Sequence, residues 1–185
     1  MVKKILFGMV TIIILVIAYY SYVFFYATRQ HSPADTAIYQ KADLDITLQY
    51  SRPYKKGRVI FAHSDEALQP YGKYWRLGAN QATKLTVNRP VSILGNVLDA
   101  GSYALYAIPG ESVWTIGFNI DSDRWGASPP DYEKDVFRIE IEVEKTKEIS
   151  EQLTIYFEEA QENGVNMVVM WDDVKLVIPM IPVDG

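Results

Sequence analysis

The sequence predicts an all-β protein, an antiparallel, jelly-roll-like β-sandwich of about nine or ten short strands preceded by one transmembrane helix. From residue 43 onward, apolar and polar side chains alternate with a period of two, in short runs separated by Gly, Pro and Asn. Aromatic residues, which favour strands, make up 13% of the chain. Residues 5–26 contain no charged side chain. A membrane segment followed by a β domain accounts for all three observations.

The uncharged N-terminal run, residues 5–26, is long enough to cross a membrane, since a helix of that length spans roughly 33 Å. A cleaved signal peptide is the alternative, but its apolar region is about 7–15 residues long and ends at small residues. Here the run ends in bulky aromatics such as Tyr22 and Tyr26. We therefore expect residues 1–28 to form an uncleaved signal anchor, in which residues 5–26 cross the membrane and contact its lipid.

The charges before this run set the expected orientation. Lys3 and Lys4 favour a cytoplasmic N-terminus. The chain is then a single-pass protein of the bacterial inner membrane, with residues 43–185 as a periplasmic β-sandwich domain. Residues 29–42 are polar and small, with one Pro and no sustained period, so we expect a linker there.

The alternation places the strands of the β domain in order along the chain. The clearest is 137–143, where apolar side chains alternate with charged ones. The expected strands cover residues 44–50, 58–63, 85–87, the hairpin 91–97, 103–108, 114–120, 137–143, 153–157, 165–171 and 174–181.

Turn residues separate the last of these strands. Asn163-Gly164 predicts a hairpin. Asp172-Asp173 is interpreted as a turn. Because proline has no N–H for a sheet ladder, Pro179 predicts that the last strand is terminal or lies at an edge.

The composition argues against several functions. With 18 basic and 23 acidic residues the net charge is −5, whereas nucleic-acid binders need a concentrated basic surface. The chain has no Cys, so disulfides and Cys-ligated zinc are excluded. His31 and His63 are the two histidines and lie far apart in the sequence, so we expect no metal site. We expect no cofactor either, because no phosphate-loop or dinucleotide motif is present.

Residues 70–83 form the stretch with the clearest functional character. Trp75 offers a flat apolar platform, Arg76 a planar fork for a carboxylate or phosphate, and Asn80 both a donor and an acceptor. We take these three as candidate binding residues.

A structural role for the same stretch is the alternative. It would be an ordered cap on the sandwich in which Arg76 pairs with an acid such as Asp135. Gly78 would then supply a special backbone angle, and Asn80 would bond to its own turn.

The long loop 121–134 supplies the remaining candidates. Trp125 in this loop is a candidate for binding a sugar ring or a partner, and Asp135 and Arg138 follow it. The loop is rich in acids, and two carboxylates held across a cleft can hydrolyse glycosides. A solvated loop is the simpler interpretation of these acids.

Short motifs spread along the chain resemble those of a known family. They are Gly57-Arg58, Pro70-Tyr71-Gly72-Lys73, Trp75-Arg76-x-Gly78-Ala79-Asn80, Ala82-Thr83, Ala100-Gly101-x-Tyr103-x-Leu105, Ile108-Pro109-Gly110, Trp114-Thr115, Trp125-Gly126 and Asp135-Val136-x-Arg138. From residue 51 to 181 the sequence resembles the bacterial domain-of-unknown-function 2911 family, known largely from Bacteroidetes. The resemblance implies an exported β-rich domain and no particular activity. Two features depart from the family pattern: Gln81 stands where Glu is usual, and residues 63–69 replace a short glycine-containing turn.

We favour a binding or assembly module, a subunit or accessory of an envelope protein complex, over an enzyme. The anchor, the aromatic loops and the lack of a catalytic constellation support this hypothesis. Two alternatives stay open. One is a carbohydrate-active enzyme that uses Arg76, Asn80 and an acid from residues 121–135. The other is a carbohydrate-binding module that uses Trp75 and Trp125.

Overall fold

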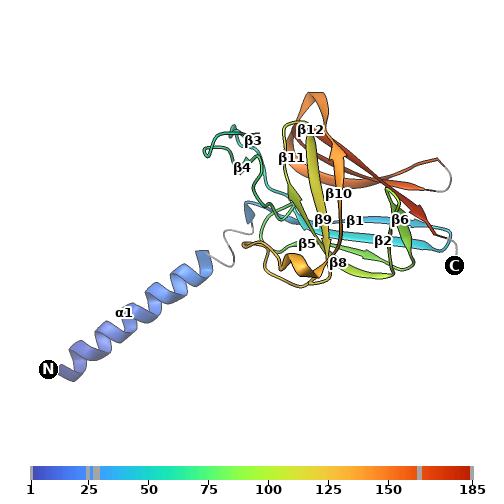
Figure 1. Ribbon diagram of the computed structural model, residues 1–185. Helices are drawn as coiled ribbons and strands as arrows, with labels where there is room; N and C mark the ends of the chain where they lie inside the picture. Colours follow the sequence, from blue (N-terminus) through green and yellow to red (C-terminus); the bar gives the residue numbers. More distant parts are fainter. Residues whose placement is uncertain (1, 24–25, 27–29, 162–163, 184–185) are drawn as a thin grey trace.

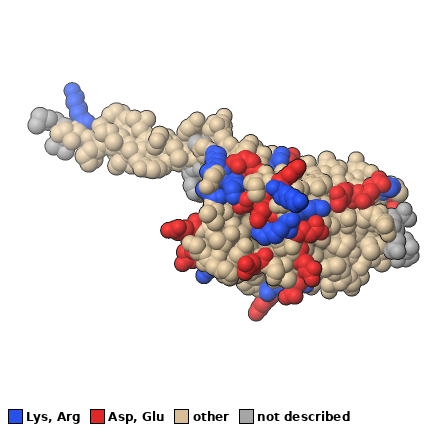
Figure 2. All heavy atoms as spheres, turned by 90° about the horizontal axis from the view of Figure 1, so that it is seen from above, with Lys and Arg blue, Asp and Glu red and all other residues tan. Residues whose placement is uncertain are grey.

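The computed structural model describes residues 2–23, 26, 30–161 and 164–183, and consists of one apolar helix and a β domain (Figure 1). The helix α1 (Val2–Tyr22) exposes its apolar side chains. Figure 2 shows charged side chains on it close to its free end. Its length and composition are sufficient to cross a membrane, and a signal sequence would have the same properties.

The β domain is an antiparallel sandwich, which confirms the predicted fold class. One sheet has the order β1-β2-β5-β8-β9-β10 and the other the order β11-β12-β6-β7, while β3 and β4 form a short parallel pair. The strands are β1 (Ala34–Lys41), β2 (Leu44–Ser51), β3 (Phe61–Ala62), β4 (Gln69–Pro70), β5 (Thr83–Val87), β6 (Val91–Ile93), β7 (Asn96–Leu98), β8 (Gly101–Ile108), β9 (Val113–Asn119), β10 (Asp135–Glu142), β11 (Glu144–Glu159) and β12 (Val165–Pro182). A 3-10 helix, η2 (Tyr132–Lys134), precedes β10.

The core lies between the two larger sheets and follows the two-residue period. In β12, for example, Met167, Val169 and Trp171 are all buried, as the alternation predicted. At one end of the sandwich the core is aromatic: Phe61 lies 4.7–5.9 Å from three tryptophans, measured between ring centroids. Those tryptophans are Trp75, Trp114 and Trp171. This aromatic cluster forms the floor beneath the loops described below.

The β domain begins earlier than the sequence suggested. Residues 34–41, expected in a linker, form β1, which pairs with β2 along its whole length. Ala37 and Tyr39 pack against the core, while the alternate positions are exposed. The alternation is weak in the sequence because two inward positions hold Asp35 and Ala37, while the apolar Ile38 faces outward.

The last strand also differs from the prediction. Asp172-Asp173 is not a turn but lies inside β12, which continues through it. Asp172 has a positive φ of 57°, and the register with β11 shifts at this point, so the strand bends at a bulge and does not end. The side chain of Lys55 donates to Asp172 and holds the bend.

The proline prediction was half right, because β12 is the terminal strand but lies inside its sheet. Pro179 falls between the part of β12 that pairs with β11 and the part that pairs with β6. A missing N–H therefore removes no ladder bond there.

Smaller differences occur elsewhere. The strand expected over 58–63 is reduced to β3, and Ile120 lies outside β9 and is exposed. The hairpin between β11 and β12 is present, although Asn163 lies outside the described residues.

Candidate functional site

Trp75 is a core residue rather than an exposed platform. Its backbone exchanges two hydrogen bonds with Ala107 of β8, at N–O distances of 2.8 and 2.7 Å. The side chain is only 3% exposed and stacks on Trp171 at 5.5 Å between ring centroids. Its indole Nε1 donates to the carbonyl oxygen of Gly78 at 2.9 Å. Trp75 therefore fixes the loop that follows it against the sandwich.

The backbone angles of this loop differ from those expected. Leu77 and Asn80 have positive φ values of 51° and 62°, and Asn tolerates that region better than most residues. Gly78 has no such angle. A Cβ there would lie 3.0 Å from the hydroxyl of Thr83 and 3.1 Å from the carbonyl oxygen of Ser51. Gly78 is thus required for close approach to β2 and β5.

Arg76 is half-buried and has no acidic partner among the described residues. Its Nη1 donates to the carbonyl oxygen of Asn80 at 2.7 Å. Burial lowers the pKa of Arg76, and the charge of Arg124 acts in the same direction. The expected pairing of Arg76 with Asp135 was wrong, since Asp135 binds other groups. The guanidinium nevertheless stays charged at neutral pH, because arginine is not deprotonated in proteins.

Arg76 lines a recess of about 880 Å³, and Trp75 and Trp171 of the aromatic cluster line the same recess. We call it the basic recess. It is lined by His31, Ser32, Pro53, Lys56, Arg58, Leu68, Gln69, Tyr74, Trp75, Arg76, Gly78, Ala79, Asn80, Trp125, Ala127 and Trp171. Among the described residues this lining includes three basic side chains and a histidine but no Asp or Glu.

The cations of the basic recess come from separate parts of the chain. Lys56 lies in the turn after β2, and its Nζ is 3.4 Å from Nδ1 of His31. Arg58 donates from Nε to the carbonyl oxygen of Lys55 at 3.0 Å. The carboxylate of Glu151 accepts a hydrogen bond from the backbone N–H of Lys56 at 2.8 Å, so this contact does not involve the lysine side chain.

The loop that carries Trp125 forms one wall of the basic recess. Gly126 packs so closely on Arg76 that an added Cβ would lie 2.8 Å from the Cβ and Cδ of that side chain. Tyr74 joins the two segments, because its hydroxyl donates to the carbonyl oxygen of Gly126 at 3.1 Å and accepts from Nη1 of Arg124 at 3.0 Å. Trp125 itself is 41% exposed.

Asn80 connects the basic recess to the segment before β1. Its side-chain Nδ2 lies 3.3 Å from the carbonyl oxygen of Ser32 and 3.4 Å from the hydroxyl of Ser51. It therefore holds the start of the β domain in place rather than bonding to its own turn.

Asp135 and Arg138 lie apart from this recess and bind each other. The carboxylate of Asp135 is 7% exposed and accepts from the Tyr106 hydroxyl at 2.6 Å, from Asn119 Nδ2 at 2.7 Å and from Arg138 Nε at 2.7 Å. Burial, reinforced by the bond to Asp135, raises the pKa of Tyr106. These contacts join β8, β9 and β10, so their role is structural.

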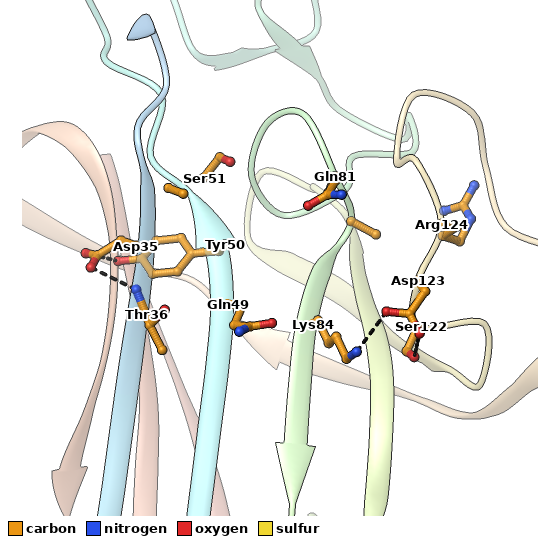
Figure 3. Close-up of a pocket in the computed structure, with 12 residues that line it drawn as sticks. Asp35, Thr36, Gln49, Tyr50, Ser51, Gln81, Lys84, Ser122, Asp123 and Arg124 are labelled. Atoms are coloured by element: carbon orange, nitrogen blue, oxygen red, sulfur yellow. Dashed lines mark hydrogen bonds and ion pairs between the residues drawn. The ribbon is translucent and has the colours of Figure 1, made fainter. Parts of the chain in front are cut away.

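A second recess, of about 410 Å³, is lined by Gln81, the residue that follows Asn80 (Figure 3). We call it the mixed recess, because its charged residues are two acids and two bases. It is lined by Ala34, Asp35, Thr36, Gln49, Tyr50, Ser51, Gln81, Ala82, Lys84, Ser122, Asp123 and Arg124. Lys84 Nζ donates to Asp123 at 2.8 Å, and this bond lowers the pKa of Asp123. Asp35 forms an ion pair of 3.1 Å with Arg52.

The constellation that the enzymatic alternative requires does not assemble among the described residues. Arg76 and Asn80 line the basic recess, but no acid from residues 121–135 lines it with them. Asp123 faces the mixed recess and Asp131 caps η2 by accepting from the backbone of Glu133. Of the candidate binding residues, Trp75, Arg76, Asn80 and Trp125 line the basic recess, whereas Asp135 and Arg138 do not. The recess is also lined by His31, Lys56, Arg58 and Tyr74, which were not candidates from the sequence. The basic residues between the first two expected strands, Lys55, Lys56 and Arg58, were the available signal.

Residues 32–180 match the family described as "Protein of unknown function (DUF2911)". The chain belongs to this family. The match covers the basic recess from Ser32 onward and includes β1. Comparisons with curated proteins and with solved structures found no match.

Proposed function

We propose that this DUF2911 protein is a membrane-anchored module of the cell envelope that binds an anionic group in the basic recess. Under this proposal α1 holds the β domain at the membrane on its outer side, and the bound group belongs to another envelope component. One observation carries the proposal: Arg76 is half-buried, and the described residues that line its recess include cations but no carboxylate. A charge that loses water without gaining an acid raises the free energy of the site. An anion from outside would lower it.

The remaining lining supports binding rather than catalysis. A guanidinium donates in a planar fork that suits phosphate or carboxylate oxygens, and Arg58 and Lys56 add charge around it. Trp125 and Tyr74 offer flat rings for an apolar or cyclic part of the ligand. No carboxylate of the described chain lines the recess, so none is placed there to donate or accept a proton in a reaction.

Titration of the full-length chain in mild detergent with inorganic phosphate tests this proposal. Tryptophan fluorescence is a suitable readout, because Trp125 is exposed while Trp75, Trp114 and Trp171 are buried. We expect a saturable change whose midpoint moves to a much higher phosphate concentration in Arg76→Gln. Lys84→Gln is the matched control, since it removes a cation from the mixed recess. Equal phosphate binding by Arg76→Gln and the unmodified chain would contradict the proposal.

A carbohydrate-binding module is the second candidate, favoured by the exposed Trp125 beside Arg76. A sugar acid would place its ring on the indole and its carboxylate on the guanidinium. Glucuronic acid is a direct probe. Binding that is lost in Trp125→Ala would support this candidate, and binding that survives the substitution would reject it.

A further inference from the structure

The position of the basic recess relative to α1 narrows the class of ligand. His31 and Ser32 line the recess, and His31 comes five residues after Tyr26, the last residue of the uncharged run. A chain of five residues extends over at most about 18 Å. If α1 spans the membrane, as the proposed function holds, one wall of the recess is held within that distance of the membrane surface. Figure 1 shows α1 leaving the domain at the end that carries β3, β4 and η2.

The side chains that line the recess suit the chemical groups found at the membrane surface. Phospholipid headgroups present phosphate groups there, and Lys56, Arg58 and Arg76 would face them with positive charge. The indole of Trp125 is amphipathic and favours the boundary between headgroups and acyl chains. The recess therefore combines a phosphate-binding fork with an interfacial aromatic residue.

Because the protein is acidic as a whole, electrostatic attraction to an anionic membrane would have to come from the basic recess. The net charge is −5, so the chain as a whole is repelled by an anionic surface. The face of the β domain in Figure 2 mixes Lys and Arg with Asp and Glu. A general electrostatic attraction is thus lacking on that face, and docking would depend on the basic recess.

We propose that the basic recess binds the phosphate of an anionic phospholipid headgroup in the same membrane that holds α1. The β domain then rests on its own membrane with the Trp125 loop at the interface. This inference depends on the proposed function, because it requires both the membrane anchor and the anion site, and it names the source of the anion.

The full-length chain in lipid nanodiscs tests the inference. One set of discs contains phosphatidylcholine alone, and in the other phosphatidylglycerol replaces part of it. Both sets carry a spin-labelled lipid that quenches tryptophan near the surface, and Trp125→Phe identifies the signal of that residue. We expect stronger quenching of Trp125 in the anionic discs, and we expect added salt to reduce the difference between the two sets.

Variants of the recess give the size of the effect. Removing one basic residue near an anionic surface lowers the ratio of docked to undocked chain about fivefold, and we expect this for Arg76→Gln and for Lys56→Gln. Lys84→Gln should leave the ratio unchanged. Circular dichroism of each variant separates lost docking from lost folding.

A soluble probe separates this inference from the proposed function. Glycerol phosphate is added to the chain in phosphatidylcholine discs. If it changes Trp125 emission while anionic discs do not, the lipid inference is overturned and anion binding stands. If neither has an effect, both are overturned. Equal quenching of Arg76→Gln and the unmodified chain in anionic discs, or binding of glucuronic acid with no response to either phosphate, would also overturn the lipid inference.

Discussion

The two recesses, one lined by Asn80 and the other by Gln81, differ in how their charges are compensated. The mixed recess is lined by Asp35 and Asp123 as well as Lys84 and Arg124, and its cations and anions are equal in number. The basic recess has three basic side chains and no acid among the described residues that line it. A polar surface that neutralises itself needs no ligand. Uncompensated charge inside a recess raises the free energy of the folded chain and is the stronger indication of a binding site.

The largest effect is expected where a carboxylate is buried and fully bonded. Asp135→Asn should lower the free energy of unfolding by about 3 kcal/mol, because Arg138 and the Tyr106 hydroxyl lose their charged acceptor. Thermal unfolding followed by circular dichroism measures it. Phosphate affinity of the folded variant should be unchanged, and a loss of affinity at full stability would give Asp135 a binding role that the structure does not support.

Arg76→Gln should act in the opposite way, on binding rather than on folding. We expect phosphate affinity to fall by about 2 kcal/mol, about thirtyfold, since a charge-assisted hydrogen bond is lost. The variant should be as stable as the unmodified chain or slightly more so, because a half-buried unpaired charge is removed. Calorimetric titration measures the fall in phosphate affinity, and thermal unfolding measures the change in stability. A marked loss of stability would instead indicate that Arg76 has a structural role.

The pH dependence of stability should arise from the fold and not from the basic recess. Burial raises the pKa of Tyr106, Tyr50 and Tyr103 above the ordinary value of about 10. The folded chain then holds protons that the unfolded chain releases. The stabilisation is complete below pH about 10 and is lost as the pH rises further. Denaturant unfolding at increasing pH measures this loss. Tyr106→Phe should reduce the slope of the unfolding free energy against pH. An unchanged slope would show that Tyr106 does not contribute to the pH dependence.

The smallest effect is expected in the mixed recess. Lys84→Gln breaks the ion pair with Asp123, whose side chain is largely exposed, and such pairs contribute little to stability. Neither phosphate affinity nor the melting temperature should change measurably. A loss of affinity comparable to that of Arg76→Gln would show that the two recesses act together, which would remove the contrast between them.

Much of the fold could be predicted because large apolar residues alternate in most strands. The pattern at 137–142 works because the apolar side chains face the core and the charged side chains between them are exposed. It fails at β1, where Ala37 and Asp35 give no contrast. It also fails at Asp172, since two consecutive acids suggest a turn while the structure uses a bulge held by Lys55.

The candidate site was harder to predict, because its parts are distant in the sequence. Arg76 and Trp125 could be identified from residue type, but Lys56 and Arg58 reach the same recess only through the path of the chain after β2. Trp75 shows the opposite difficulty. Its residue type suggests a binding platform, whereas the pairing with Ala107 places it in the core.

A crystal structure of the full-length chain grown with phosphate tests the central claim most directly. The account predicts a phosphate in the basic recess, bonded to the guanidinium of Arg76 and close to Arg58 or Lys56. A phosphate bound instead to Lys84 and Arg124, or a basic recess that closes on an acid of the chain itself, would contradict it.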